Sequence, residues 1–567
     1  MPGDWGLSQG SSLSSVCSWR FQVKCCPALN TDENFTMNEK QVFTEALCKE
    51  SDLQEGEMRE FEVQGHPILL VKHDGKFSAV GSKCSHYGAP LIKGVLSGDR
   101  VRCPWHGACF NIKSGDIEEY PGLDSLPCFE VTVENGIVYI TTSKQALEVT
   151  KRVKYTGSHS SSDRSTVAII GTGPAGLVCA ETLRQEGFAG RIVMVSKDNH
   201  IPYDRTKLSK AMRTKASDIY LRPAEFFTER DIEVWTSKEV LSVNTDEARI
   251  KFRQGSFLQY NQLLIATGSR PREPNCPGSS LKNVFLLRTP EDANAISEKA
   301  VKRKVVIIGS SFIGMEVAAF LSDKASSVSV IGKSEVPFQA VLGSQVGELV
   351  MKLLQERGVT FYMKTEVREI RGDGTQVQEV ILRNGIQIPA DLVVAGIGVL
   401  PVSNFLKGSR VVVDHQGAIF VDEFMRTSVP DVFAAGDVAS FPLPMMEGRR
   451  VNTGHWQMAH SHGRIAALNM LNKHVSINSV PFFWTSLLGK SIRYAGYGAG
   501  HTEILLKGDL LELKFLAFYL KNDIVVAVSS MNFDPMVSKV AEILLSGRRI
   551  TKQEVLKEDF MNPGIQI

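Results

Sequence analysis

The chain has 567 residues, of which 43% are hydrophobic, so it is long enough to form three or four domains with a core each. Its formal net charge is +2 with 22% charged residues, and this balance argues against nucleic-acid binding and against an acidic, solvated tail. Ten cysteines are spread too thinly for a disulfide scaffold, which indicates a reducing, intracellular compartment.

Residues 1–40 are expected to form a flexible tail. The segment is rich in Ser and contains Arg20 and Lys24, so it is weakly similar to a mitochondrial transit peptide, although it lacks an Arg-rich amphipathic face. The mitochondrion is therefore the first expectation for the compartment, and the cytosol is the second. The sequence has no run of about 18 apolar residues, so we expect no membrane-spanning helix.

Residues 41–144 are predicted to form a small all-β domain. Short strand-type runs alternate there with turn residues, for example at 61–63, 68–71, 131–133 and 138–140.

Two Cys-His pairs inside this domain predict a metal centre. One residue separates Cys84 from His86, two residues separate Cys103 from His106, and sixteen residues lie between the pairs. Two thiolates can hold one iron of a [2Fe-2S] cluster while two neutral imidazoles hold the other. A structural zinc site is the alternative, but zinc fingers keep like ligands paired. The mixed pairs therefore favour a cluster, and the stretch resembles a Rieske domain.

A linker is expected at 145–163, because residues 156–163 are small and polar. A buried-type strand at 166–170 then leads into a GxGxxG turn formed by Gly171, Gly173 and Gly176, and into an apolar helix. In this context the glycines permit a tight turn, close approach of a pyrophosphate and close helix packing. Asp198, which follows the next strand, is the candidate ligand for the ribose.

Two later segments make a family resemblance specific. Residues 202–210 read Pro-Tyr-Asp-Arg-Thr-Lys-Leu-Ser-Lys, and residues 266–271 read Ala-Thr-Gly-Ser-Arg-Pro. These segments look like signatures of two-dinucleotide flavoprotein reductases of the oxygenase-coupled ferredoxin reductase type, which include apoptosis-inducing factor. The resemblance implies that Lys210 lies near the flavin nitrogen that accepts hydride. It also implies FAD contacts for Arg205, Thr267, Gly268 and Arg270.

A second strand-turn-helix lies inside the first fold and predicts an NAD(P)-binding domain at 291–415. Its turn carries Gly309, Ser311 and Gly314, so a serine replaces the middle glycine. By the same resemblance, Glu316 pairs with Lys210, and these two residues are the catalytic candidates. A solvent-facing ion pair is the alternative for Glu316. Gly398 resembles the glycine of the family segment beside the nicotinamide.

The residues after the strand at 327–331 bear on the choice of nucleotide. NAD sites usually have a carboxylate at this point, whereas NADP sites have small and basic residues. Gly332 and Lys333 stand here, with Glu335 close behind. We therefore expect NADPH to be used at least comparably with NADH. The alternative is that Lys333 is a solvated loop residue and that Glu335 reaches the ribose.

The chain is expected to return to the FAD fold at 416–475. Residues 427–438 resemble the second FAD signature, in which Asp437 would hold a ribityl hydroxyl. Trp456 falls where the family has an aromatic residue against the flavin, and a packed core tryptophan is the alternative. From residue 476 to residue 567, three strand-like runs and an apolar-periodic helix at 535–545 predict a C-terminal interface domain.

The whole pattern resembles apoptosis-inducing-factor-like proteins with an N-terminal Rieske domain. The expected fold is a small all-β domain, then an α/β two-dinucleotide-binding flavoprotein with a C-terminal α+β domain, in which the FAD domain occupies 164–290 and 416–475. The resemblance implies an oxidoreductase that passes electrons from NAD(P)H through FAD to its own cluster and on to an unknown acceptor. The alternative is a redox-gated binding protein that promotes cell death, with nucleotide reduction as the switch. The oligomeric state is left open.

Overall fold

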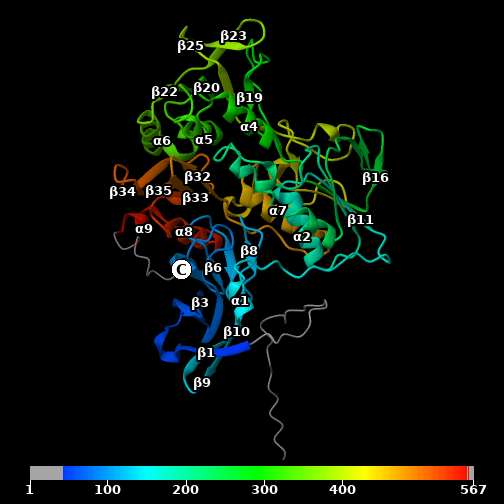
Figure 1. The fold of residues 1–567 in the computed structure, drawn as a ribbon, viewed down its shortest axis with the longest axis vertical. Coiled ribbons are helices and arrows are strands. Elements are labelled where there is room, and N and C mark those ends of the chain that lie inside the picture. Colours follow the sequence, from blue (N-terminus) through cyan, green and yellow to red (C-terminus); the bar gives the residue numbers. More distant parts are fainter. Residues whose placement is uncertain (1–41, 558–559, 561–567) are drawn as a thin grey trace, which may run out of the picture.

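A computed structural model describes residues 42–557 and 560 of the chain, so the tail expected at 1–40 lies outside the described residues. Figure 1 shows the N-terminal domain (blue) at one end of the long axis and the segment around β23 at the other. The C-terminal helices (red) lie beside the N-terminal domain. None of the described helices is long and apolar enough to cross a membrane.

The N-terminal domain contains two antiparallel sheets. The larger has the order β1-β10-β9-β4-β3-β2, and the smaller has the order β5-β6-β7-β8. Side chains in β10 alternate between buried and half-buried, the pattern of a sheet with one covered face. The strands are β1 (Val42–Lys49), β2 (Met58–Val63), β3 (His66–His73), β4 (Lys76–Gly81), β5 (Val95–Ser97), β6 (Arg100–Arg102), β7 (Cys109–Asn111), β8 (Ile117–Glu119), β9 (Cys128–Glu134) and β10 (Ile137–Ser143). A short helix, α1 (Lys144–Glu148), follows.

The first nucleotide domain is built on a parallel sheet of order β13-β12-β11-β17-β29. Its inner strands are almost wholly buried, as expected for a sheet with helices on both faces. The last strand comes from the far side of an insertion, so the domain has two parts. Its main elements are β11 (Thr166–Ile170), α2 (Pro174–Gln185), β12 (Arg191–Val195), α3 (Ala224–Glu229), β13 (Ile232–Trp235), β17 (Gln262–Ile265), β29 (Val432–Ala434) and α7 (Trp456–Met470). Two smaller sheets flank it: β14 (Val240–Asn244), β15 (Arg249–Phe252) and β16 (Phe257–Gln259), and β28 (Ile419–Phe420), β30 (Ala439–Leu443) and β31 (Arg449–Val451).

The inserted domain repeats this plan with the parallel order β19-β26-β20-β21-β22. The chain crosses between the two domains at β18 and β27, which pair antiparallel. β19 already belongs to the inserted sheet, whereas the expected limits put its residues in the FAD part. Its elements are β18 (Ser269–Pro271), β19 (Val284–Leu286), α4 (Pro290–Lys299), β20 (Lys304–Ile308), α5 (Phe312–Leu321), β21 (Ser327–Ile331), α6 (Gln339–Gln355), β22 (Val359–Tyr362), β23 (Val367–Gly372), β24 (Val377–Leu382), β25 (Gln387–Pro389), β26 (Leu392–Ala395) and β27 (Val399–Pro401).

The C-terminal domain is an antiparallel sheet of order β32-β33-β36-β35-β34 with two helices. The three strand-like runs expected here correspond to β33, β35 and β36, while β32 and β34 were not anticipated. The apolar face of α8 packs on this sheet, which explains its 3.6-residue pattern. The elements are β32 (Phe482–Leu487), β33 (Lys490–Gly496), β34 (Glu503–Asp509), β35 (Lys514–Lys521), β36 (Ile524–Met531), α8 (Met536–Leu545) and α9 (Lys552–Leu556).

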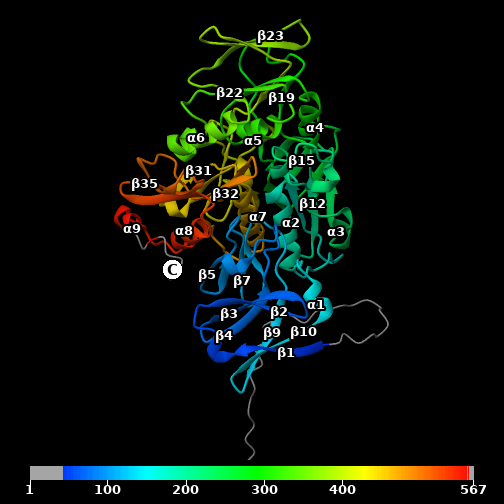
Figure 2. The ribbon, with the colours of Figure 1, turned by 60° about the vertical axis from the view of Figure 1, so that its left-hand side comes forward.

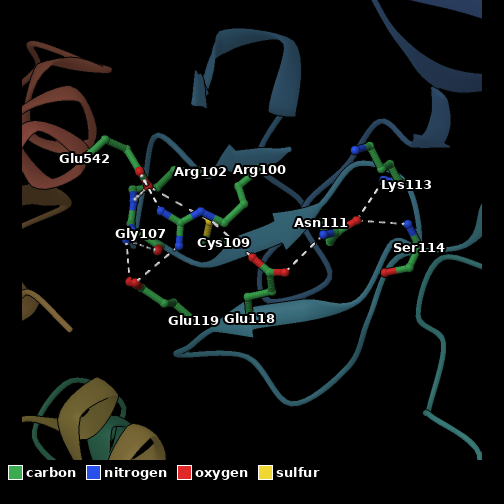
Figure 3. Close-up of polar contacts among 10 residues, drawn as sticks. All are labelled: Arg100, Arg102, Gly107, Cys109, Asn111, Lys113, Ser114, Glu118, Glu119 and Glu542. Carbon is green, nitrogen blue, oxygen red and sulfur yellow. Dashed lines mark hydrogen bonds and ion pairs between the residues drawn. The ribbon is translucent and has the colours of Figure 1, made fainter. Parts of the chain in front are cut away.

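Buried charges hold the N-terminal domain on the C-terminal domain. Figures 1 and 2 both place α8 beside the small sheet. Arg102 of β6 is fully buried, and its guanidinium donates to Glu542 of α8 at 2.5 Å and pairs with Glu119 at 2.9 Å. Figure 3 shows both carboxylates pointing at this guanidinium, with Arg100 alongside at 2.9 Å from Glu542. Burial alone would lower the pKa of Arg102, but the two carboxylates raise it well above its usual value.

A second buried ion cluster ties the N-terminal domain to the first nucleotide domain. Arg222 pairs with Glu181 of α2 at 2.9 Å and with Asp124 of the N-terminal domain at 2.6 Å. The backbone carbonyl of Asp124 in turn accepts at 2.6 Å from Ser85, the residue between Cys84 and His86 in the first Cys-His loop. The N-terminal domain is therefore fixed from two sides.

We predict that Glu542→Ala destabilises the chain by about 3–5 kcal/mol, because it removes one of the two carboxylates that neutralise a fully buried guanidinium. The midpoint of urea unfolding, followed by tryptophan fluorescence, measures the loss. The control is Glu447→Ala, which breaks the exposed pair with Arg549 and should change stability by less than about 0.5 kcal/mol. Equal losses in the two variants would contradict the prediction.

Candidate functional site

The two Cys-His pairs lie on two loops of the same backbone shape. The amide of Cys84 donates to the carbonyl of Ala89 at 2.8 Å, and the amide of Cys103 donates to the carbonyl of Ala108 at 2.8 Å. Each loop turns at a glycine in the left-handed region, with φ of 74° at Gly88 and 75° at Gly107. The loops follow β4 and β6, so the two sheets bring the pairs face to face.

The four candidate ligands gather in like pairs. The two cysteine thiols are buried and hydrogen bonded to each other, which together with burial raises the pKa of Cys84. The imidazole rings lie 5.0 Å apart between centroids. Burial, helped by neighbouring positive charges, lowers the pKa of His86 to about 3 and that of His106 to about 2, so both rings are neutral, as metal ligands must be. Nδ1 of His86 is buried and has no hydrogen-bond partner.

This donor set fits a [2Fe-2S] cluster better than a single ion. Two irons bridged by sulfide keep a thiolate pair and an imidazole pair apart, whereas one zinc draws all four ligands together. Over residues 42–557 and 560, no three His, Cys, Asp or Glu side chains gather closely enough to hold one metal ion. The arrangement in like pairs is what favours the cluster over the zinc alternative.

A cavity of about 780 Å³ lies where the first nucleotide domain, the inserted domain and the C-terminal domain meet. It is lined by most of the cofactor-binding candidates from the sequence. These are Gly171, Gly173, Asp198, Arg205, Lys210, Thr267, Gly268, Arg270, Ser311, Glu316, Gly398, Asp437 and Trp456. Of the other candidates, Gly176 and Gly314 lie in the first turns of α2 and α5, Gly309 follows β20, and Gly332 and Lys333 follow β21.

In each glycine turn at the cavity, the first glycine packs so closely on the neighbouring backbone that no side chain would fit. A Cβ at Gly171 would lie 2.1 Å from the carbonyl oxygen of Ala266, and one at Gly309 would lie 2.3 Å from that of Gly396. At Gly173, by contrast, a Cβ would meet nothing within 4 Å, so this residue faces open cavity. Such a cradle in front of a helix N-terminus fits a dinucleotide pyrophosphate.

Charged groups line the cavity beside the first glycine turn. Asp198 accepts from Arg205 at 2.6 Å and from Tyr203 at 3.2 Å. Burial opposes ionisation of Asp198, but Arg205 outweighs it and lowers the pKa of this carboxyl. Asp437 accepts from Ser269 at 2.8 Å. The sequence analysis missed Arg288, whose half-buried side chain also lines the cavity and whose pKa is lowered, first by loss of solvation and then by Arg205.

Lys210 and Glu316 form an ion pair of 2.9 Å at the cavity wall. The side chain of Glu316 is only 3% exposed, so its carboxylate does not face solvent. Glu316 also accepts hydrogen bonds from Ser209 and, at 2.7 Å, from Thr485 of β32. One carboxylate from α5 thus joins three domains. The contribution of Thr485 gave no signal in the sequence, because it depends on how the C-terminal domain docks.

The cavity and the cluster loops share an aromatic wall. Trp484 of β32 lines the cavity, and its ring lies 4.3 Å from that of His106 and 5.7 Å from that of His86. Trp456, at the start of α7, lines the same cavity and lies 5.3 Å from the ring of His460. The sequence analysis singled out Trp456 and missed Trp484, the residue that joins the two sites.

The residues after β21 form a charged surface. Lys333 is 80% exposed and pairs with Glu366 at 2.8 Å, and Arg383 pairs with the same carboxylate at 3.1 Å. Glu335 pairs with Lys364. A Cβ at Gly332 would lie 2.6 Å from the hydroxyl of Ser310 and 2.7 Å from the end of the Met363 side chain, so the carboxylate typical of NAD sites would require these two side chains to move.

Three family models match the chain. The model described as pyridine nucleotide-disulphide oxidoreductase matches residues 165–463, the Rieske [2Fe-2S] domain matches 44–130, and the reductase C-terminal model matches 482–561. These matches imply FAD, NAD(P)H and a [2Fe-2S] cluster, and they confirm the expected fold class and cofactors.

Curated proteins and solved structures agree with these matches. Apoptosis-inducing factor 3 of Homo sapiens is 51% identical over 515 residues, which cover 90% of this chain and 85% of the relative. The benzene 1,2-dioxygenase system ferredoxin--NAD(+) reductase subunit of Pseudomonas putida is 32% identical, covering 69% and 95%. A chain in the crystal structure of the covalent putidaredoxin reductase-putidaredoxin complex is 28% identical, with a TM-score of 0.66 and coverage of 70% and 97%. The chain therefore belongs to the pyridine nucleotide-disulphide oxidoreductase family, as an oxidoreductase with a Rieske domain and homology to apoptosis-inducing factor 3.

Proposed function

We propose that this oxidoreductase takes electrons from NAD(P)H through FAD to its own Rieske cluster and on to a separate acceptor. The observation that carries the proposal is the contact of Trp484 with both sites: its ring borders the nucleotide cavity and lies 4.3 Å from that of His106. FAD, when bound, accepts an electron pair as hydride and releases electrons singly, which suits a one-electron cluster.

We assign the cavity wall by domain. Gly171, Gly173 and Gly176, with the other candidates of the first nucleotide domain, would hold FAD. Gly309, Ser311, Gly314 and Gly398 would hold the nicotinamide nucleotide, with Gly332 and Lys333 near its ribose. Cys84, His86, Cys103 and His106 would hold the cluster. The domain limits expected from the sequence are part of this proposal, except that β19 belongs to the inserted domain.

The fused Rieske domain supports an internal route. The putidaredoxin relative was solved as a covalent complex of a reductase with a separate putidaredoxin. In this chain the corresponding redox domain is attached by a linker and fixed by the buried Arg102 and Arg222 clusters. We propose that the Rieske domain takes the place of such a separate carrier.

We propose an intracellular compartment, with the mitochondrion first and the cytosol second. Outside the pair formed by Cys84 and Cys103, which are hydrogen bonded to each other, the cysteines at 48, 109, 179 and 276 have free thiols. Reduced thiols are typical of proteins from reducing compartments.

The first test of the electron route is Trp484→Leu, with Trp484→Phe as the variant that keeps an aromatic ring. We expect the leucine variant to slow reduction of the cluster by more than about tenfold, since misplacing reacting groups by ~1 Å can cost ~10²-fold. Flavin reduction by NADH should keep its rate. Anaerobic stopped-flow absorbance, following the flavin and cluster bands together, separates the two steps.

Two outcomes would count against the route. An unchanged rate of cluster reduction in Trp484→Leu would show that this tryptophan is not part of the electron route. A wild-type flavin that stays reduced for minutes beside an oxidised cluster would favour the redox-gated, cell-death-promoting switch instead.

We predict that Lys210→Met slows flavin reduction by NADH about a hundredfold, because the ammonium held by Glu316 would stabilise the negative charge of reduced flavin. The dissociation constant for FAD should change much less. Single-turnover reduction and FAD titration measure the two effects. Lys215→Met, an exposed lysine in the same segment, is the matched control and should leave both unchanged. An unaltered single-turnover rate would take Lys210 out of the catalytic pair.

We also predict that NADPH is used at least comparably with NADH. Lys333, Lys364 and Arg383 outnumber the two carboxylates with which they pair, which leaves positive charge for a 2′-phosphate. Lys333→Ala should lower kcat/KM for NADPH more than for NADH, whereas Lys352→Ala on α6 should alter neither. A wild-type preference for NADH above about tenfold, or about 1.4 kcal/mol in transition-state stabilisation, would refute this prediction.

A further inference from the structure

The second cluster loop is closed off by the flavoprotein. A Cβ at Gly107 would lie 2.7 Å from the ring of Phe482, so this turn packs directly on β32. The carbonyl of Cys103 accepts from Ser538 of α8 at 2.8 Å, and that of Trp105 accepts from Arg493 of β33 at 2.9 Å. This side of the cluster faces the cavity and is not accessible to another protein.

The first cluster loop has the same backbone shape but lies open. Gly88 is exposed, and a Cβ there would meet nothing within 4 Å. Tyr87 beside it is 46% exposed, an unusual value for an aromatic residue so close to buried ligands. Its ring lies 3.8 Å from that of His86 and 5.6 Å from that of His106. Tyr87 is therefore in ring contact with both imidazoles and is also exposed at the surface of the molecule.

The charges around this opening are mainly positive. Lys151 of the linker is exposed and Lys207 of the first nucleotide domain is half-buried. Arg152, which follows Lys151, pairs through its backbone with Ser125, and the carbonyl of the adjacent Asp124 accepts from Ser85 of the first cluster loop. The amide of Lys207 donates to the carbonyl of Asp204, whose carboxylate accepts from the hydroxyl of Tyr87 at 3.4 Å. The two ammonium groups outnumber this one carboxylate.

We propose that Tyr87 and Gly88, with Lys151 and Lys207, form the surface at which the reduced cluster passes its electron to a separate one-electron carrier protein whose docking face bears carboxylates. Opposite charge brings such a partner to the loop, and the exposed ring shortens the path to the imidazoles. Each encounter oxidises the cluster by one electron and reduces the carrier by one. One NAD(P)H, oxidised to NAD(P)⁺ with release of a proton, supplies two encounters. The inference rests on the proposed function for the source of the electrons.

A redox-inert anion tests whether negative charge approaches the cluster here. The holoprotein is reduced with dithionite, and microwave power saturation of the cluster's electron paramagnetic resonance signal is measured with tris(oxalato)chromate(III). Hexaamminechromium(III) is the cationic comparison. In the wild type we expect the anion to increase the electron-spin relaxation rate of the cluster more than the cation does. Lys151→Glu/Lys207→Glu should reverse this order while the g-values stay the same.

A matched variant separates local from overall charge. Lys49 and Lys76 are exposed at the ends of β1 and β4 away from the cluster loops, so Lys49→Glu/Lys76→Glu changes net charge equally and should keep the wild-type order. Reoxidation of the reduced cluster by ferricyanide gives the kinetic counterpart. It should be slower by about tenfold in the Lys151/Lys207 variant alone, the size of effect expected from electrostatic steering at low salt.

The two proposals fail in different ways. Because dithionite supplies the electrons, the relaxation measurement does not depend on NAD(P)H or on Trp484. If NADH fails to reduce the cluster while the charge effects hold, the proposed function is wrong and this surface stands. If both double variants behave alike, or if the wild type shows no preference for the anion, the surface is not the exit.

Discussion

The structure depends on one buried guanidinium. Arg102 lies at the centre of the small N-terminal sheet, and leaving it without counter-charges would cost several kcal/mol. Glu119 comes from its own domain, but Glu542 comes from α8, more than four hundred residues later. The same guanidinium donates to the carbonyl of Gly107 at 3.0 Å. Docking of the C-terminal domain, neutralisation of the charge and orientation of the cluster loop are therefore a single event.

The redox sites meet where three chain segments converge. Glu316 comes from α5, Lys210 comes from the segment after β12, and both Thr485 and Trp484 come from β32. β32 thus contacts the ion pair through one residue and the cluster ligands through its neighbour. Since successive residues of a strand point to opposite faces, one short strand serves both sites. Through this strand the C-terminal domain contacts both sites.

Local patterns were readable in the sequence, and contacts between domains were not. The glycine turns and the Cys-His loops follow from steric and ligand rules that act within a few residues, so they can be recognised from short stretches of sequence. Trp484, Arg288 and Glu542 act through partners from other segments, and nothing in their own neighbourhoods marks them. Lys333 illustrates the same limit, because its partner Glu366 comes from the start of the β23 hairpin. β19 was expected in the FAD domain but lies in the inserted sheet, because it pairs with β26, a strand far away in the sequence.

The linker and the buried ion clusters affect how the rate of electron transfer would depend on protein concentration. A reductase and a separate redox protein meet by diffusion, so their rate depends on the concentrations of both. A docked, covalently attached domain replaces that encounter with a fixed local concentration, set by geometry alone. In the proposed route, the step from nucleotide cavity to cluster is therefore first order in this one chain. Dilution would slow only the proposed delivery of electrons to a separate acceptor.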